Sequence, residues 1–280
     1  MWRQIYSVDS DFSAPAMTDR KGPPVVGQVP GEIAPRHTFE KAWQERFAEF
    51  ASIREDDAGI AGWSPTGLET RFRFFCSLWT GAEKDAVFLD VGCGAGTYSR
   101  WLADQGLTVI GVDYSYLSLV KGRRRDSARV HYCASDAMCL PFPDGSVDGA
   151  LCFGVLQAVW DSAPVVAELA RVVRPGGEVW IDALNAWNPA AFWDRSQRRL
   201  KGKSMHLRYE SAHALLELMR VAGFEALSRH WLPIMPRRLR RFQALSETPF
   251  ARRVLNAVPA LGSIASHSFV IRGIRRSSTP

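Results

Sequence analysis

The chain has 280 residues, of which 46% are hydrophobic and 23% are charged, with 22 glycines and 16 prolines. These proportions are those of a globular protein, and they exclude collagen-like, low-complexity and small disulfide-stapled chains. The net charge of +6 is divided unevenly, because residues 1–184 carry −6 and residues 185–280 carry +12. The basic C-terminal third fits either an anionic partner or a solvated basic face.

The hydropathy and the cysteines of the sequence indicate the cellular compartment of the protein. No stretch approaches the ~20 apolar residues that a membrane span needs, and the N-terminus lacks the apolar core of a secretory signal. The five cysteines are odd in number and include no C-x-x-C pair, which argues against a disulfide framework and a thiolate zinc site. We therefore expect a cytoplasmic protein, peripheral to a membrane at most, with no bound metal.

The N-terminal part shows two kinds of pattern. Residues 1–35 are rich in proline and glycine and show no periodicity, which predicts a disordered tail. Residues 36–82 then predict a helical cap of two helices. One helix has four aromatic residues on a single face, namely Phe39, Trp43, Phe47 and Phe50. Thr66 and Glu69 have the spacing of a capping box at the start of the other helix.

From residue 83 onward, short apolar runs alternate with helical segments, which indicates a parallel sheet buried between helices. Strands are predicted at 86–91, 108–113, 129–135, 147–153, 178–184, 225–231 and 266–274. Helices are predicted near 97–105, 114–123, 162–174 and 210–222. Two basic insertions, 185–209 and 232–265, interrupt this domain of residues 83–280. The first is too long for a plain loop and predicts a short helix or a functional segment.

The strongest motif is VFLDVGCGAGTYSRWLADQG at 87–106, where a strand is followed by Gly92, Gly94 and Gly96 and then by a helix. Glycines allow unusual backbone dihedrals and close approach of a ligand, and the helix N-terminus offers free N–H groups. A dinucleotide fingerprint would need glycine where Thr97 stands, and the Gly-Lys pair of a P-loop is absent.

Two carboxylates follow the next two strands. Asp113 lies about 20 residues after the first glycine, where it can accept both hydroxyls of a ribose or instead cap the next helix. Asp136 opens the segment DAMCLPFPDGSVD. Its carboxylate can accept from an adenine amino group while the N–H of Ala137 meets a ring nitrogen. Further on, Pro175-Gly176-Gly177 predicts a turn.

In this order and spacing, the segments resemble those of the class I S-adenosylmethionine-dependent methyltransferases, in particular the small-molecule and quinone enzymes. The resemblance implies an α/β, Rossmann-like, mostly parallel sheet of seven strands, the last antiparallel. It also implies S-adenosyl-L-methionine as the cofactor. The residues it implies are Asp90, Gly92, Gly94 and Gly96 for the methionine part, Asp113 for the ribose, Asp136 and Ala137 for the adenine, and Phe153 and Gly154 beside the sulfonium. The expected site also includes Cys93, Tyr114 and Ser135, which flank these positions.

The sequence leaves the catalytic base unassigned. Many members of the resembled family carry a histidine after the fourth strand, where this chain reads VLQAVWD. The candidates are His206, His213, Asp161 and Gln157, although each such residue taken alone is more often a surface or packing residue. Motifs of several nucleic-acid and protein methyltransferases are absent, which favours a small-molecule or lipid-like acceptor. An acceptor pocket is predicted at Asn185, Trp187, Phe192 and Trp193, with helix packing as the alternative.

The basic insertions suggest partners of their own. Their cationic residues are Arg195, Arg198, Arg199, Lys201, Lys203, Arg208, Arg237, Arg238, Arg240 and Arg241. Interleaved with aromatic and aliphatic residues, they suit an anionic bilayer, a phosphorylated substrate or an RNA backbone. We expect a methyltransferase for a small or lipid-like acceptor. The alternatives are an RNA-modifying methyltransferase and a catalytically silent module of the same fold that docks on an anionic surface.

Overall fold

A computed structural model describes residues 36–125, 129–204, 206–235 and 241–277. The predicted tail at 1–35 lies outside these residues, as do Arg237, Arg238 and Arg240.

Seven strands form one sheet in the order β3-β2-β1-β4-β5-β7-β6. The strands are β1 (Val87–Val91), β2 (Thr108–Asp113), β3 (Val130–Ala134), β4 (Val147–Cys152), β5 (Val173–Leu184), β6 (Phe224–Leu232) and β7 (Ser268–Arg275). All neighbouring pairs are parallel except those of β7, which runs antiparallel to β5 and β6. The predicted Rossmann-like sheet with an antiparallel last strand is confirmed.

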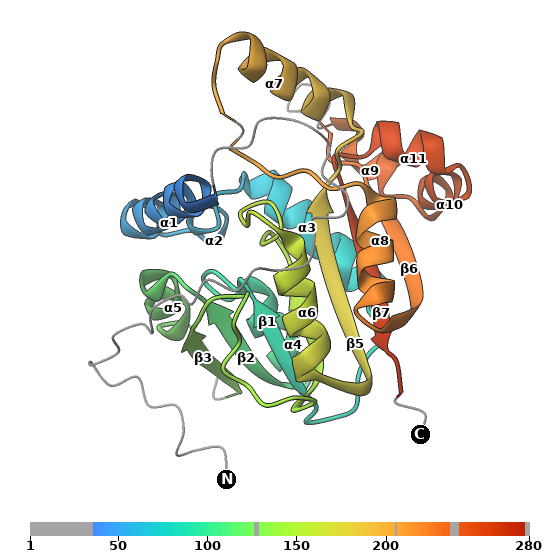
Figure 1. The fold of residues 1–280 in the computed structure, drawn as a ribbon. Coiled ribbons are helices and arrows are strands. Elements are labelled where there is room, and N and C mark those ends of the chain that lie inside the picture. Colours follow the sequence, from blue (N-terminus) through green and yellow to red (C-terminus); the bar gives the residue numbers. More distant parts are fainter. Residues whose placement is uncertain (1–35, 126–128, 205, 236–240, 278–280) are drawn as a thin grey trace.

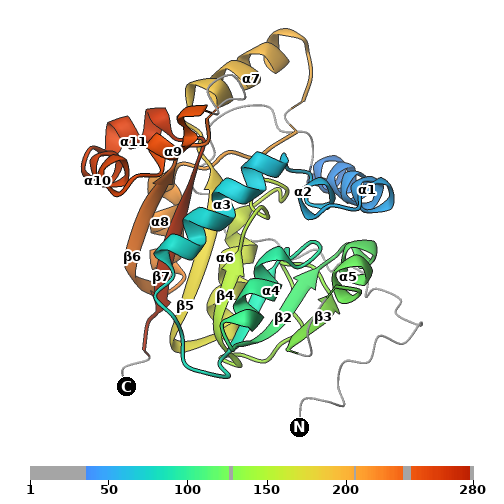
Figure 2. The same cartoon turned by 180° about the vertical axis from the view of Figure 1, so that it is seen from behind.

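Helices cover both faces of this sheet. Helices α3 (Pro65–Leu78) and α4 (Thr97–Asp104) cross one face (Figure 2), while α6 (Ser162–Val172) and α8 (Ala212–Val221) cross the other (Figure 1). Helix α5 (Tyr116–Arg123) packs on β2 and β3 at the edge of the sheet. This layering explains why the parallel strands are apolar on both faces.

Each face has its own hydrophobic core. The α3–α4 face is mainly aromatic, and Phe75 makes edge contacts there with Tyr98 and Trp180. The α6–α8 face is mainly aliphatic, with Leu169 and Met219 fully buried. Because α3 lies in this core, it is part of the helical layer, and only α1 (Arg36–Ile53) and α2 (Asp57–Ile60) remain as a cap above the strand ends (Figure 1).

The start of α3 differs from the prediction. The cap is Ser64, whose side chain accepts from the N–H of Gly67 at 3.1 Å, and Pro65 takes the first helical position. Thr66 therefore lies inside the helix, and Glu69 pairs with Arg73 one turn later. Proline fits the first helical turn because its missing N–H is not needed there, so the capping-box prediction was wrong by two residues.

The end of α6 and the insertions also differ in detail. Strand β5 begins directly after α6, at Val173, and the predicted Pro-Gly-Gly turn is an irregularity within it, because the pairing shifts from Val147↔Val173 to Gly149↔Glu178. The first insertion carries the expected helix, α7 (Pro189–Leu200). The second carries α9 (Gln243–Ser246), α10 (Pro249–Ala257) and α11 (Pro259–Ala265). None of the described helices has the length and apolar character needed to cross a bilayer.

Candidate cofactor site

The carboxyl ends of β3, β2, β1 and β4 lie side by side, because parallel strands of this order end at one edge of the sheet. Asp113 ends β2 opposite Ala134 of β3, and Val91 pairs with both Val112 and Cys152. Asp136, Asp113, the glycine loop and Gly154 therefore follow one another along this edge. The sequence placed these tips together correctly.

The three loop glycines have different reasons for being glycine. All have positive φ, but a Cβ on Gly92 would lie 2.2 Å from a Val155 methyl group, and a Cβ on Gly96 would lie 2.2 Å from the Tyr132 hydroxyl. A Cβ on Gly94 would meet nothing closer than Ala61, at 4.0 Å. Gly92 and Gly96 thus make room for protein side chains, and only Gly94 faces free space.

Asp113 joins the glycine loop to the tip of β2. One carboxylate oxygen accepts from the N–H of Gly94 at 2.9 Å and the other from the N–H of Ser115 at 2.8 Å. Burial raises the pKa of this carboxyl, and these backbone bonds oppose the rise. The ribose hypothesis and the helix-capping hypothesis are therefore compatible, because a carboxylate has about four lone-pair sites and two are used.

Asp90 points into the protein. It is 1% exposed and accepts a 2.6 Å hydrogen bond from the Ser99 hydroxyl of α4. Burial raises its pKa to about 6, against the hydrogen bond from Ser99, while the charge of Asp113 adds to the rise. Asp90 can therefore act on a ligand only by setting the position of α4, whose first residues follow the glycine loop.

The tip of β3 is open to solvent. Asp136 is exposed, and its Oδ1 accepts from the N–H of Met138 at 2.8 Å. The hydroxyl of Ser135 donates to the carbonyl of Cys139 at 3.0 Å, which closes the same turn. These contacts hold the Asp136 carboxylate at the rim and leave its second oxygen outside the turn, where a ligand amino group can reach it.

A buried ion pair at the tips of β4 and β5 was not foreseen from the sequence. Asp182 accepts from the N–H of Gly154 at 2.6 Å and from Arg71 of α3 at 3.2 Å. The guanidinium of Arg71 also lies over the Trp63 ring, 4.3 Å from its centroid, and that ring packs on Gly154. Arg71 interrupts the apolar stripe of α3. A charged residue in such a stripe could have indicated a buried ion pair from the sequence.

Phe153 contributes its backbone only. Its ring is 6% exposed and packs edge-on against Phe75 and Tyr98, in the aromatic core behind the crevice. Side chains alternate between the two faces of a strand, and this position faces α3 and α4. Of the two residues expected beside the sulfonium, Phe153 therefore presents only its backbone at the strand tip.

The cap closes over these strand tips. The Tyr114 hydroxyl donates to the carbonyl of Trp43 in α1 at 3.1 Å, and Phe39 of α1 makes an edge contact with Trp160 after β4. Helix α2 is tied to α4, because Asp57 accepts from the Thr97 hydroxyl at 2.6 Å and pairs with Arg100. Asp57 also pairs with Arg125, which follows α5. These contacts hold α1 and α2 over the strand tips.

The candidate bases differ in their surroundings. Asp161 is the N-cap of α6 and accepts from the N–H of Ala163, which is a structural role. Gln157 is buried, and His213 is exposed on α8. Burial lowers the pKa of His206, and Arg198 adds to this effect. The half-buried imidazole of His206 thus favours its neutral form.

His267 was missed by the sequence analysis. It directly precedes β7, and an antiparallel strand starts at the edge where the parallel strands end. Burial and the charge of Arg71 lower the pKa of His267 to about 4, so its imidazole is neutral at pH 7. Its position next to a predicted strand was a usable signal.

The predicted acceptor pocket in the first insertion is not present as such. Trp187, Phe192 and Trp193 are 63%, 65% and 67% exposed. Only Asn185 is buried, where it donates to the carbonyl of Ser266 at 2.8 Å. The aromatic residues turn away because the polar face of α7 is held by the protein: Arg195 donates to the carbonyl of Ala186. The basic face is also smaller than expected, since Arg208 is buried against Glu210.

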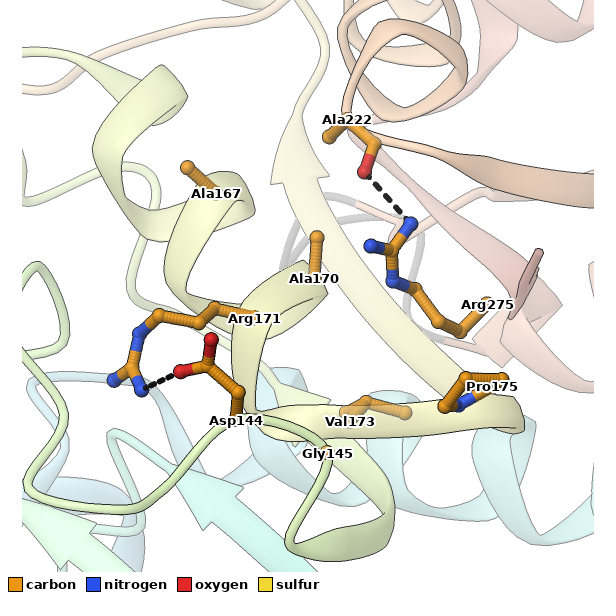
Figure 3. Close-up of a pocket in the computed structure, with 9 residues that line it drawn as sticks. All are labelled: Asp144, Gly145, Ala167, Ala170, Arg171, Val173, Pro175, Ala222 and Arg275. Carbon is orange, nitrogen blue, oxygen red and sulfur yellow. Dashed lines mark hydrogen bonds and ion pairs between the residues drawn. The ribbon is translucent and has the colours of Figure 1, made fainter. Parts of the chain in front are cut away.

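A cavity of about 510 Å³ lies at the opposite edge of the sheet, at the amino ends of β4 and β5 (Figure 3). Its two guanidiniums already have partners: Arg171 bonds to Glu168 and Asp144, and Arg275 bonds to the carbonyl of Ala222. Ligands of open α/β sheets bind at the carboxyl ends of the strands. This cavity is therefore not the candidate site.

Comparison with known proteins agrees with this geometry. Residues 89–181 match a protein family described as a methyltransferase domain. A demethylmenaquinone methyltransferase from Renibacterium salmoninarum is 38% identical over 113 residues, which are 40% of this chain and 47% of that protein. A malonyl acyl-carrier-protein O-methyltransferase from Serratia marcescens is 38% identical over 100 residues, 35% of this chain and 38% of that protein.

The chain therefore matches a methyltransferase domain over residues 89–181. It spans about half or less of the length of these relatives. Among solved structures, the cyclase SpnF has the same fold, with a TM-score of 0.59 and 21% identity over 89% of this chain and 100% of that one. The cofactor of the family is S-adenosylmethionine. The open position at Gly94, the rim carboxylate of Asp136 and the uncapped N-terminus of α4 fit such a ligand.

Proposed function

We propose that the protein transfers the methyl group of S-adenosylmethionine to a small-molecule or lipid-like acceptor. The observation that carries the proposal is the bond between Gly94 and Asp113. It holds the one loop glycine that faces free space against the carboxylate expected to bind the ribose. The strand tips on either side end in Asp136 and Gly154, so the edge is long enough for an extended adenosyl ligand.

Different residues at the strand tips would bind the cofactor and orient the reacting groups. S-adenosylmethionine supplies the electrophilic methyl group on a sulfonium. We assign the ribose hydroxyls to Asp113 and the adenine amino group to Asp136. Methyl transfer needs in-line alignment, and Asp182 serves it by fixing Gly154 at the tip of β4. The rigid tip positions the reacting groups without contributing a proton.

Helix α1 and His206 are candidates for covering the site and for accepting a proton, respectively. Helix α1 places Phe39 and Trp43 above the strand tips, which excludes water and suits an acceptor of limited size. An acceptor that loses a proton needs a base whose pKa lies near the working pH. His206 is the candidate, because the pKa of His267, about 4, makes its imidazole a weak base. The demethylmenaquinone methyltransferase relative supports an acceptor with lipid character.

The test is product analysis with methyl-labelled S-adenosylmethionine and fractionated extract of the source cells. Label in an organic-extractable or low-molecular-weight fraction is the expected result, and at limiting cofactor it should fall with Asp113→Ala. Label in RNA that ribonuclease releases would support the RNA-modifying alternative instead. Cofactor binding without label in any fraction would support the silent module.

A further inference from the structure

Helix α7 has its apolar side turned outward. Only one of its twelve residues, Ala191, is buried, whereas Phe192, Trp193 and Leu200 are 65%, 67% and 81% exposed. At 3.6 residues per turn these three lie within about 100° of one another, and Trp193 and Leu200 lie opposite Ala191. Single exposed apolar residues are ordinary, but a contiguous face of this kind marks an interaction surface.

The opposite, polar side of α7 is used by the protein itself. Arg195 donates to the carbonyls of Ala186 and Ala191 and lies over the Tyr209 ring. Arg198 pairs with Asp194 on the same helix. The bond to Ala186 and the contact with the Tyr209 ring reach outside the helix, and they hold it with its apolar side toward solvent.

The apolar face continues beyond α7. Trp187, just before the helix, is 63% exposed, and Ile264 of α11 is 57% exposed. The two helices are joined at this point, because the Asn188 amide donates to the carbonyl of Ile264. Figures 1 and 2 show α7 standing above the carboxyl ends of the strands, away from the two helical layers.

Cationic residues lie beside this face. Arg199, Lys201 and Lys203 are exposed, and none forms an ion pair with another residue in the described parts of the chain. The C-terminal third that contains them has a net charge of +12. Tryptophan with lysine and arginine is the combination that suits the boundary between lipid headgroups and acyl chains, and the cations match an anionic headgroup.

We propose that the surface formed by Trp187, Phe192, Trp193, Leu200 and Ile264, with Arg199, Lys201 and Lys203, docks on an anionic lipid bilayer. The aromatic residues enter the headgroup region and the cations contact lipid phosphates. Because α7 follows the carboxyl end of β5, docking places the bilayer on the side of the molecule where the cofactor site opens. The inference goes beyond the proposed methyl transfer, since binding to lipid requires neither cofactor nor acceptor.

The test is flotation of the full chain with vesicles of phosphatidylcholine, with or without phosphatidylglycerol. We expect flotation only with phosphatidylglycerol and its loss at high salt. The double variant F192S/W193S should bind the vesicles at least about tenfold more weakly than the parent. The triple variant R199Q/K201Q/K203Q should lose the preference for anionic lipid. The matched control is Val221→Ser, because Val221 is 85% exposed on α8 and should float like the parent protein.

Several results would overturn the proposal. They are an absence of flotation with phosphatidylglycerol, equal flotation of both multiple variants and the parent, or an equal loss with Val221→Ser. A dimer in light scattering that F192S/W193S converts to a monomer, without vesicle binding, would make a second copy the occupant. The charge variant keeps the test valid if F192S/W193S does not fold. Flotation is measured apart from methyl transfer, so the two proposals fail separately.

Discussion

At the scale of single residues, the glycine loop combines two demands. Gly92 and Gly96 accommodate Val155 and Tyr132, whereas Gly94 leaves open space beside Asp113. The three glycines of the motif therefore differ in role: two make room for protein side chains, and one leaves space for a ligand.

This division gives a first prediction. Gly94→Ala should lower the free energy of unfolding by only ~1 to 2 kcal/mol, the cost of left-handed backbone for alanine, but should greatly weaken cofactor binding. Gly96→Ala should cost more, because its Cβ meets the Tyr132 hydroxyl. Tyr132→Phe should then recover part of the loss. Urea denaturation without cofactor gives the free energy of unfolding of the parent, Gly94→Ala, Gly96→Ala and the double variant Gly96→Ala/Tyr132→Phe. An equal loss of stability at the two glycines would contradict this division of roles.

Asp113→Ala should weaken cofactor binding by ~1 to 3 kcal/mol, through lost hydroxyl contacts and a loosened Gly94. Calorimetry with S-adenosylmethionine and its demethylated product measures the change. Asp104→Ala, at the far end of α4, is the control that should bind normally. Unchanged affinity in a folded Asp113→Ala protein would remove the ribose assignment.

Asp90 predicts a pH dependence. Burial raises its pKa to about 6 in the folded protein, above the ~3.9 of an unfolded chain. Its contribution to stability is therefore complete below about pH 4 and is lost as the pH rises through 6. Asp90→Asn should be more stable than the parent by about 3 kcal/mol at pH 7, with the difference shrinking toward pH 4. A difference that is constant from pH 4 to 7 would contradict the assigned pKa.

At the scale of elements, the cap is attached to the cofactor site by few contacts. Helix α2 is held through Asp57 to Thr97, Arg100 and Arg125, and α1 through Tyr114 and Trp160. Such an element opens more easily than the sheet, where every strand has a fully paired neighbour.

Asp57→Asn should therefore speed hydrogen exchange in α1 and α2 without changing exchange in β1 and β4. Cofactor binding should weaken by a few fold, because the start of α4 loses its partner. Glu69→Gln removes the exposed pair with Arg73 and is the control. Exchange that rises equally across the sheet would mean general destabilisation instead.

At the scale of the whole molecule, binding should stiffen one edge of the sheet. Ligand at about 100 times its Kd stabilises the folded state by ~2.7 kcal/mol, which for a domain of this size raises Tm by several degrees. We expect slower exchange at the ends of β1, β2 and β4 and in the cap, measured with S-adenosylmethionine present. Exchange near Arg171 and Arg275, at the amino ends of the strands, should not change. Protection there would move the site to the cavity of Figure 3.

The sequence by itself determined the strands, their parallel arrangement and the alignment of Asp113, Asp136 and Gly154 along one edge. These features follow from local periodicity and from the rule that parallel strands end together, so neighbouring residues carry the information. The start of α3 was misplaced by two residues, because Ser64 and Thr66 are both good capping residues and the preference of Pro65 for the first helical position was not used.

Only the tertiary structure decided which side each residue faces. The ring of Phe153 turned into the core, and Trp193 turned to solvent. His267 and Arg71 met near the tips of β5 and β7 from positions 196 residues apart in the sequence. The reason is that local patterns specify a helix or strand but not its partners, and the direction of a side chain on an insertion depends on contacts distant in the chain.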